Sequence, residues 1–401
     1  MTTPGFLRQN ARWLGAGGLL AFSGSYGQTF FIAIFAGDIQ DSFGLSHGAW
    51  GAIYALGTLG SAAVMVWLGT LTDHYRVRRL GPWALAGLAA ACLAMAVNPW
   101  VWALPLVVFG LRLGGQGMVT HVGRVAMARW FSANRGKAIS VSSLGYSVGE
   151  ALLPILFVAL LTVVEWRALW GLAALLSLAA IPVLLALLHR ERQPQSYAED
   201  SQSTGSGGRH WTRAEVVRAP FFWAIVPALL STPAFVTAFF FQQVHLAAEK
   251  DIAHLDLVAL FPLYSVVSVL AMLGTGFLVD RFGTRLLMCL FTLPLALSFI
   301  VISGTETLLG LAVGLSLLAV TVGANNTLPA AFWADMFGTR HLGAIKSVAM
   351  ALMVLSSAIG PLITSLAIDA GASFPAQMPL ISLYIALSTG LLAAALWRTR
   401  A

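Results

Sequence analysis

Apolar runs of about 20 residues recur along the whole chain, which has 401 residues. Such a run is long enough to cross the hydrocarbon core of a membrane as a helix. Only 10% of the residues are charged and 58% are hydrophobic, whereas a soluble domain needs far more charge on its surface. The sequence therefore predicts an all-α membrane protein with about twelve transmembrane helices. The runs cover approximately residues 13–36, 48–70, 81–98, 103–128, 138–163, 168–188, 219–246, 257–279, 285–303, 307–333, 343–367 and 378–397.

The Lys and Arg residues outside these runs are distributed unequally between alternate loops. If the N-terminus is cytoplasmic, the outer loops contain only Arg167 and Lys250. This bias predicts a multi-pass protein of the cell inner (plasma) membrane with both termini in the cytoplasm. The net charge of +7 then faces the anionic leaflet, and we expect no nucleic-acid partner. The first run is too long for a signal-peptide core and no clear cleavage site follows it, so we expect it to be retained.

A polar, Ser- and Gly-rich segment interrupts the apolar pattern at His189–Pro220. It predicts a six-helix bundle over residues 1–188, a cytoplasmic linker over 189–218 and a second six-helix bundle over 219–401. The end of the segment, TRAEVVRAP, is compatible with a short amphipathic helix on the membrane and equally with an extended tether.

The two halves carry the same landmarks at a constant offset of 207 residues. Because the landmarks fall in two different loops and a helix, chance is a poor explanation. The sequence therefore predicts a duplicated six-helix unit. The matching pairs are Gly69 and Gly276, Asp73 and Asp280, Gly136 and Gly343, and Pro154 and Pro361.

The first two pairs belong to a loop pattern that we interpret as a gate. Its glycine would let two helices approach closely at the cytoplasmic rim. Its aspartate would face a helix N-terminus and a neighbouring arginine, and so hold one state of a moving structure closed. The candidate gating residues are Gly69, Asp73, Arg78, Gly276, Asp280, Arg281 and Arg285.

These loops resemble the signature of the major facilitator superfamily, and the resemblance covers nearly the whole chain. GFLVDRFGTR matches the signature between helices 8 and 9 closely. GTLTDHYRVRR, between helices 2 and 3, keeps Gly69, Asp73 and Arg78, but His74 replaces the usual arginine and Arg76 stands where glycine is typical. The resemblance implies the major facilitator fold, with twelve helices in two six-helix pseudo-repeats, and a secondary transporter.

Within the superfamily, RWFSANRGKAISVSSLGYSVG resembles the helix 4–5 region of the monocarboxylate porter and oxalate/formate antiporter group. Such carriers often place a basic residue inside helix 8. Here LVALFPLYSVVSVLAMLGTGF contains none, and helix 11 has only Lys346, near its cytoplasmic start. This departure weighs against a carboxylate substrate.

Four ionisable residues fall inside the fourth and fifth runs, where charge is expensive. A buried arginine costs about 2.5–3.5 kcal/mol near a helix centre on insertion scales, so Arg112 should have a compensating partner. Glu150, roughly 21 Å up the fifth helix, is the best candidate. The pair could be a fixed link between helices or an exchangeable pair that opens on substrate or proton binding. Arg124 could snorkel to the headgroups, and His121 is compatible with a hydrogen-bonded packing residue.

From these charges we expect a site near the membrane midplane, with a charged wall in the first half of the chain and a neutral, aromatic wall in the second. Glu150 is the candidate proton-coupling residue. The candidate substrate-binding residues are Arg112, Gln116, His121, Tyr26, Gln28, Tyr264, Asn325 and Asn326.

The favoured function is secondary active transport of a small organic anion, monocarboxylate-like and coupled to protons, by alternating access. Proton-coupled efflux of hydrophobic or cationic compounds and a non-transporting membrane receptor remain alternatives. The sequence has no phosphate-binding loop and no HExxH or CxxC pattern, so we expect neither an enzyme nor a cofactor. Its two cysteines, Cys92 and Cys289, lie far apart inside separate runs and predict no disulfide or metal. The expected partners are the substrate, protons and the lipid bilayer, and the protein is expected to be a monomer.

Overall fold

The protein is described here by a computed structural model that covers residues 3–131, 135–190, 210–338 and 340–398. All regular secondary structure in these residues is helical. Eleven helices are long and apolar enough to cross a membrane, and there are twelve if the bent pair Gly5–Gly27 and Thr29–Phe43, which meet at 47°, forms one span. The prediction of an all-α membrane protein with about twelve transmembrane helices is confirmed.

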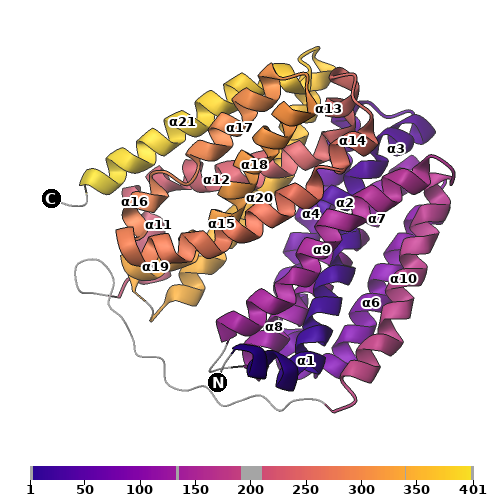
Figure 1. Ribbon diagram of the computed structural model, residues 1–401, viewed down its shortest axis with the longest axis horizontal. Coiled ribbons are helices and arrows are strands. Elements are labelled where there is room, and N and C mark those ends of the chain that lie inside the picture. Colours follow the sequence, from indigo (N-terminus) through magenta and orange to yellow (C-terminus); the bar gives the residue numbers. More distant parts are fainter. Residues whose placement is uncertain (1–2, 132–134, 191–209, 339, 399–401) are drawn as a thin grey trace. The chain divides into compact units, whose positions relative to one another are not determined.

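The chain forms two compact units, Met1–Glu199 (unit 1) and Asp200–Ala401 (unit 2) (Figure 1). Unit 1 contains α1 (Thr3–Ser23), η1 (Gly24–Gly27), α2 (Thr29–Ile32), η2 (Ala33–Phe35), α3 (Ala36–Phe43), α4 (His47–Leu68), α5 (Leu71–His74), α6 (Val77–Val97), η3 (Val101–Ala103), α7 (Leu104–Leu111), η4 (Arg112–Val119), α8 (Thr120–Trp130), α9 (Arg135–Leu161) and α10 (Trp166–Leu187). Unit 2 contains α11 (Arg213–Arg218), α12 (Pro220–Phe241), α13 (Gln243–Glu249), α14 (His254–Val258), α15 (Phe261–Phe282), α16 (Thr284–Met288), α17 (Leu293–Gly304), α18 (Leu308–Asn325), α19 (Leu328–Phe337), α20 (Leu342–Asp369) and α21 (Phe374–Arg398).

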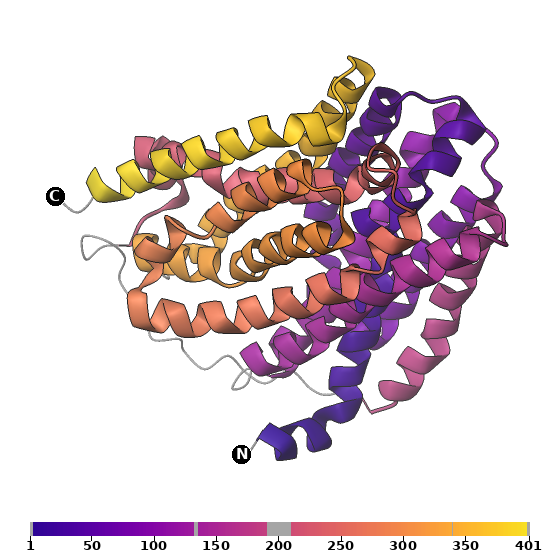
Figure 2. The same cartoon turned by 45° about the horizontal axis from the view of Figure 1, so that its top comes forward.

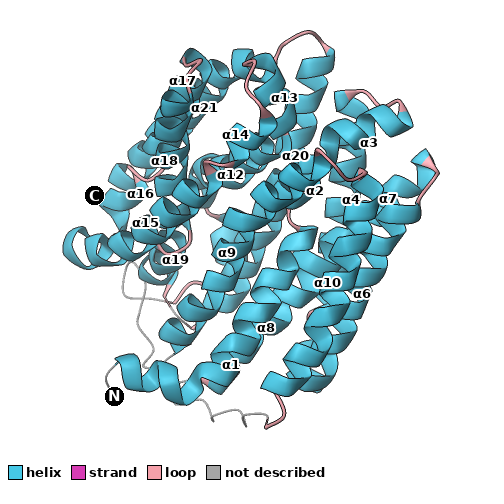
Figure 3. Cartoon of the chain, turned by 45° about the vertical axis from the view of Figure 1, so that its right-hand side comes forward, coloured by secondary structure: helices cyan, strands magenta, loops and turns pink. Residues whose placement is uncertain are grey.

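Small residues let the helices of unit 1 pack closely. Helix α1 packs along α9, and α6 packs along α10 (Figure 3). A Cβ atom on Gly145 of α9 would collide with the carbonyl oxygen of Gly18, and one on Gly149 would collide with the hydroxyl of Ser25. In a membrane, where apolar burial does not drive helices together, such close backbone contact supplies van der Waals packing energy.

Unit 2 uses the same packing device on different helix pairs. A Cβ atom on Gly360 of α20 would collide with the carbonyl oxygen of Ala234 in α12, and one on Gly323 of α18 would collide with that of Ser268 in α15. Helix α21, yellow in Figure 2, packs along α17. Each unit is therefore held together mainly by close helix crossings.

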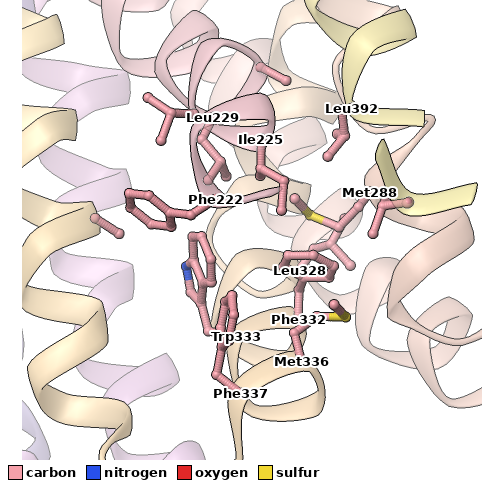
Figure 4. Packing of buried hydrophobic residues seen from close by; sticks show 14 of the residues in the cluster. Phe222, Ile225, Leu229, Met288, Leu328, Phe332, Trp333, Met336, Phe337 and Leu392 are labelled. Atoms are coloured by element: carbon pink, nitrogen blue, oxygen red, sulfur yellow. The ribbon is translucent and has the colours of Figure 1, made fainter. Parts of the chain in front are cut away.

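Buried hydrophobic side chains, several of them aromatic, form a cluster in unit 2 (Figure 4). The rings of Trp333 and Phe337 stack with centroids 5.6 Å apart, and Phe222 lies beside Trp333 at 5.9 Å. Trp211 packs edge-on against Phe337 and donates its backbone N–H to the Phe337 carbonyl. The cluster therefore anchors the chain just before α11. Helix α11 lies in the segment that was predicted to be a linker. A capping box formed by Thr212 and Glu215 begins this short helix.

Lys250, at the end of α13, is 5% exposed and caps another helix of unit 2. Its ammonium group donates to the carbonyl oxygens of Thr305 at 2.7 Å and Ser303 at 3.3 Å, where α17 ends. It also lies 3.6 Å from the carboxylate of Glu306, whose side chain is 74% exposed. The hydrogen bonds to the helix end should therefore contribute more to stability than the solvent-screened ion pair does.

We predict that Lys250→Met lowers the free energy of unfolding by about 1–3 kcal/mol, because it leaves partly buried carbonyl groups without donors. Glu306→Gln, the control, should change it by less than about 1 kcal/mol. Thermal unfolding in detergent, followed by tryptophan fluorescence, measures both effects. Equal destabilisation by the two variants would contradict the capping role.

Candidate functional site

Two irregular helix segments meet inside unit 1. The first span changes to a 3-10 turn at Gly24–Gly27 and becomes extended at Gln28, whose ψ is 155°. The span that contains α7 and α8 is π-helical between them, at Arg112–Val119. The two segments pack together. A Cβ atom on Gly115 would lie 2.6 Å from the Cα atom of Gly27, so only glycine fits this crossing.

Arg112 stabilises the break in the first span. Its side chain is 2% exposed, and its Nη1 atom donates to the carbonyl oxygen of Gly27 at 3.1 Å and to the hydroxyl of Thr29 at 3.3 Å. Its guanidinium also lies over the ring of Tyr54, 5.3 Å from the centroid, and the Tyr54 and Thr29 hydroxyl oxygens are 2.5 Å apart. Non-helical backbone at membrane depth needs such a donor, because lipid provides none.

Glu150 lies in α9 with its side chain 6% exposed. It accepts a hydrogen bond of 3.1 Å from the hydroxyl of Tyr146, one helical turn earlier. Arg112 and Arg124 both lie close enough to that hydroxyl to act on it electrostatically. The structure therefore brings two cations and one carboxyl group together around Tyr146, while the hydrogen bonds described for Arg112 go to neutral acceptors.

The remaining polar residues predicted for the site in unit 1 have different surroundings. Gln116 is exposed, whereas Gln28 is 9% exposed and lies at the break of the first span. His121 is half-buried, and its Nε2 atom lies 3.6 Å from the position that a Cβ atom on Gly69 would take. Tyr26 is 2% exposed and packs edge-on against Phe31, so its ring belongs to an aromatic core.

The residues predicted for the site in unit 2 lie in uncharged surroundings, beside an aromatic ring or between two helices. Tyr264 is 1% exposed, and its ring packs edge-on against Phe240 at 5.3 Å. Asn325 and Asn326 lie where α18 ends and α19 has not yet begun. Asn326 is exposed, and the buried Oδ1 atom of Asn325 has no hydrogen-bond partner among the described residues.

The first copy of the candidate gating loop is tied to the neighbouring helix ends. Arg78 donates to the carbonyl oxygen of His189 at 2.9 Å, just beyond α10. Arg129, at the end of α8, donates to the carbonyl oxygen of Thr72. The side chain of Asp73 lies outside the described residues.

In the second copy of the candidate gating loop, the glycine does not lie at the close approach of two helices that the sequence predicted. A Cβ atom on Gly276 would meet no described atom within 4 Å, so close packing does not explain this glycine. Asp280 and Arg281 are exposed, whereas Arg285 is half-buried. Thr284 donates to the carboxylate of Asp335 at 2.8 Å, which joins this loop to α19.

Four residues of the site were not predicted, and for one of them, Arg124, the sequence indicated only that it could snorkel to the headgroups. Tyr146 could have been found, because it stands four residues before Glu150 and such pairs share one face of a helix. Thr29 and Tyr54 could not, because their contact with Arg112 depends on the break at Gly27. Among the described residues, no group of three or more His, Cys, Asp and Glu side chains could hold a metal ion.

We predict that Gly115→Ala strongly destabilises the protein, because the added methyl would force the two irregular segments apart. Gly171→Ala is the matched control, since a Cβ atom in that helix meets no atom within 4 Å. The control should keep the wild-type melting temperature to within a few degrees. Melting temperatures and monodispersity in detergent measure the difference, and equal behaviour of the two variants would contradict the close crossing.

Comparisons with known proteins place these observations in a family. The family described as Major Facilitator Superfamily matches residues 17–399. A bacterial homologue of the human lysosomal transporter Spinster, solved in an inward-facing and occupied conformation, superposes with a TM-score of 0.70 at 15% identity, over 100% of this chain and 98% of that one. Its inward-facing, unoccupied form gives 0.67 at 15% identity, over 99% and 95% of the two chains.

A further solved structure, of the nucleoside transporter NupG, superposes with a TM-score of 0.69 at 13% identity, over 96% of this chain and 99% of that one. No curated protein matches the chain. The identities are too low to transfer a substrate, but the family match covers nearly the whole sequence. The chain belongs to the major facilitator superfamily, and it is a multi-pass secondary transporter of a small solute rather than an enzyme.

Proposed function

We propose that this transporter moves a small organic anion, monocarboxylate-like, together with protons. The observation that carries the proposal is the cluster around Tyr146, whose hydroxyl donates to the buried carboxyl group of Glu150 and on which two arginines act electrostatically. Ionisable groups inside a membrane usually line the path of a substrate or of protons. This cluster contains both a group that can carry a proton and groups that attract an anion.

The charges in the cluster provide a physical basis for coupling. With Glu150 ionised, its negative charge offsets one of the two arginine charges and repels an incoming anion. Protonation of Glu150 removes that repulsion, so an anion binds more tightly. By linkage, the bound anion raises the affinity of Glu150 for a proton by the same factor. Binding of proton and anion would therefore be cooperative, as symport requires.

The same charges weigh against the alternative of cation export. A cationic compound would meet two guanidinium groups next to a single carboxyl group, and like charges in a low-dielectric site repel strongly. Carriers of the monocarboxylate porter and oxalate/formate antiporter group often have a basic residue in helix 8, which this chain lacks. Arg112 and Arg124 would provide that positive charge from the fourth span instead. We accordingly propose the monocarboxylate porter and oxalate/formate antiporter group as the nearest functional class.

Topology and gating complete the proposal. We infer from the Lys and Arg distribution that both termini are cytoplasmic, that residues 189–218 link two six-helix domains and that the protein is a monomer of the plasma membrane. The loops with Asp73 and Asp280 would form a clamp that closes the cytoplasmic side in the outward-open state.

The first experiment addresses coupling. In proteoliposomes that contain radiolabelled L-lactate as the probe, Glu150→Gln should abolish accumulation driven by a pH gradient, because glutamine cannot exchange a proton. Exchange of lactate across the membrane without a gradient should persist. Glu306→Gln is the matched control, since it removes a carboxylate whose side chain is 74% exposed and lies outside the cluster. Accumulation at the wild-type level in Glu150→Gln would remove Glu150 from the coupling mechanism.

The second experiment addresses the clamp. Asp280→Asn and Asp73→Asn should each increase the labelling rate of a cysteine placed at Ala128, in α8, in a background in which the two native cysteines are replaced by alanine. Loss of the carboxylate charge weakens its attraction for arginines and helix N-termini, and so favours opening. Unchanged labelling in both variants would show that these loops only set the topology.

A further inference from the structure

Arg124 lies in a different environment from Arg112, although both belong to the span Val101–Trp130. Arg124 is exposed, whereas Arg112 is 2% exposed. Arg112 uses its guanidinium to hold Gly27 and Thr29. No hydrogen bond or ion pair with a described residue occupies the guanidinium of Arg124. One arginine therefore serves the fold, and the other is available to a ligand.

Arg124 is within reach of Tyr146, which stands deeper in the next span. Arg124 lies six residues before the end of α8, about 9 Å along the helix, and Tyr146 lies eleven residues after the start of α9, about 16 Å. The two helices are consecutive and pack together, so both distances are measured from the same side. The two depths differ by about 7 Å, which an arginine side chain can span, and Arg124 lies close enough to the Tyr146 hydroxyl to act on it electrostatically. A snorkelling arginine would instead extend toward the nearer membrane surface.

The exposed residues of this span near Arg124 are polar. Gln116 is exposed and His121 is half-buried, while Val122, Gly123 and Ala126 on the other side of the helix are buried. Polar and charged side chains of a membrane span face a water-filled path more often than lipid. Arg124 would thus be reached from water and by a dissolved solute.

We propose that Arg124 is the residue that binds the carboxylate of the transported solute, and that Arg112 is a positioning residue for the break in the first span. This inference rests on the proposed function and names the substrate group that the same cluster recognises. The planar guanidinium can donate two parallel hydrogen bonds to the two oxygens of a carboxylate. The Tyr146 hydroxyl, on which Arg124 acts electrostatically, would supply a third donor.

Tyr146 also links the anion to the proton. While Glu150 is ionised, the Tyr146 hydroxyl donates to its carboxylate. Once Glu150 is protonated, this acceptor is weaker, and the hydroxyl can turn to a carboxylate held by Arg124. The solute thus replaces Glu150 as the anion of the cluster, and the net charge of the cluster stays the same.

Ligand-induced thermal stabilisation of the full-length protein in detergent tests this assignment. The probes are L-lactate and phenylacetate, with lactamide and phenylacetamide as neutral counterparts at equal ionic strength. At least one carboxylate should stabilise the wild type, and neither amide should. Arg124→Gln should lose the effect. Arg124→Lys should weaken apparent affinity at least about tenfold, because lysine lacks the planar fork. Arg8→Gln, which removes a charge from an exposed position of α1, should behave as the wild type does.

Folding and coupling are checked separately. Without ligand, Arg124→Gln should melt within a few degrees of the wild type, since the side chain makes no hydrogen bond to a described residue. Full carboxylate stabilisation of Arg124→Gln, or none of the wild type by either probe, would overturn the assignment. Arg124-dependent binding without accumulation driven by a pH gradient would leave the assignment standing and refute the coupled transport. Accumulation that is driven by a pH gradient and is unaffected by Arg124→Gln would refute the assignment of Arg124 and leave the coupled transport standing.

Discussion

The hydrogen bond from Arg112 to the carbonyl oxygen of Gly27 is the contact on which the organisation of unit 1 depends. The first span can leave the helical conformation at Gln28 only if the carbonyl group freed there finds a donor, because lipid offers none. Arg112 can reach it only because glycines at positions 27 and 115 let the two backbones touch. A costly buried charge, a helix break and a close crossing thus require one another.

Arg112 and Arg124 belong to one span, but only Arg112 is needed to hold the helix break. Arg112 is enclosed by Gly27, Thr29 and the ring of Tyr54, so its charge is spread over groups that stay in place. Arg124 has no such enclosure, yet it acts on the same Tyr146 hydroxyl. A fixed cation thus stabilises the break, and in our proposal the second cation is the one that binds the solute.

The sequence predicted the membrane class and the twelve helices well, because hydropathy and length respond directly to the bilayer. It also identified Arg112 and Glu150 as residues that need an explanation. It could not locate the helix break, since SGSYGQTFF has small residues compatible with either a regular or a broken helix. Nor could it predict how the ring of Tyr26 packs. A tyrosine has an apolar ring and a polar tip, and here the ring packs against Phe31 in a buried core.

The π-helical segment Arg112–Val119 changes which side of the span later residues occupy. In a regular α-helix, Arg112 and Arg124 would point about 120° apart, at about 100° per residue over twelve residues. A π-helical segment bonds each residue to the fifth one along and so has more residues per turn. It therefore acts as a rotational offset that turns α8 relative to α7. Conversion of this segment between π- and α-helical hydrogen bonding would twist Arg124 about the helix axis while Arg112 stays in place.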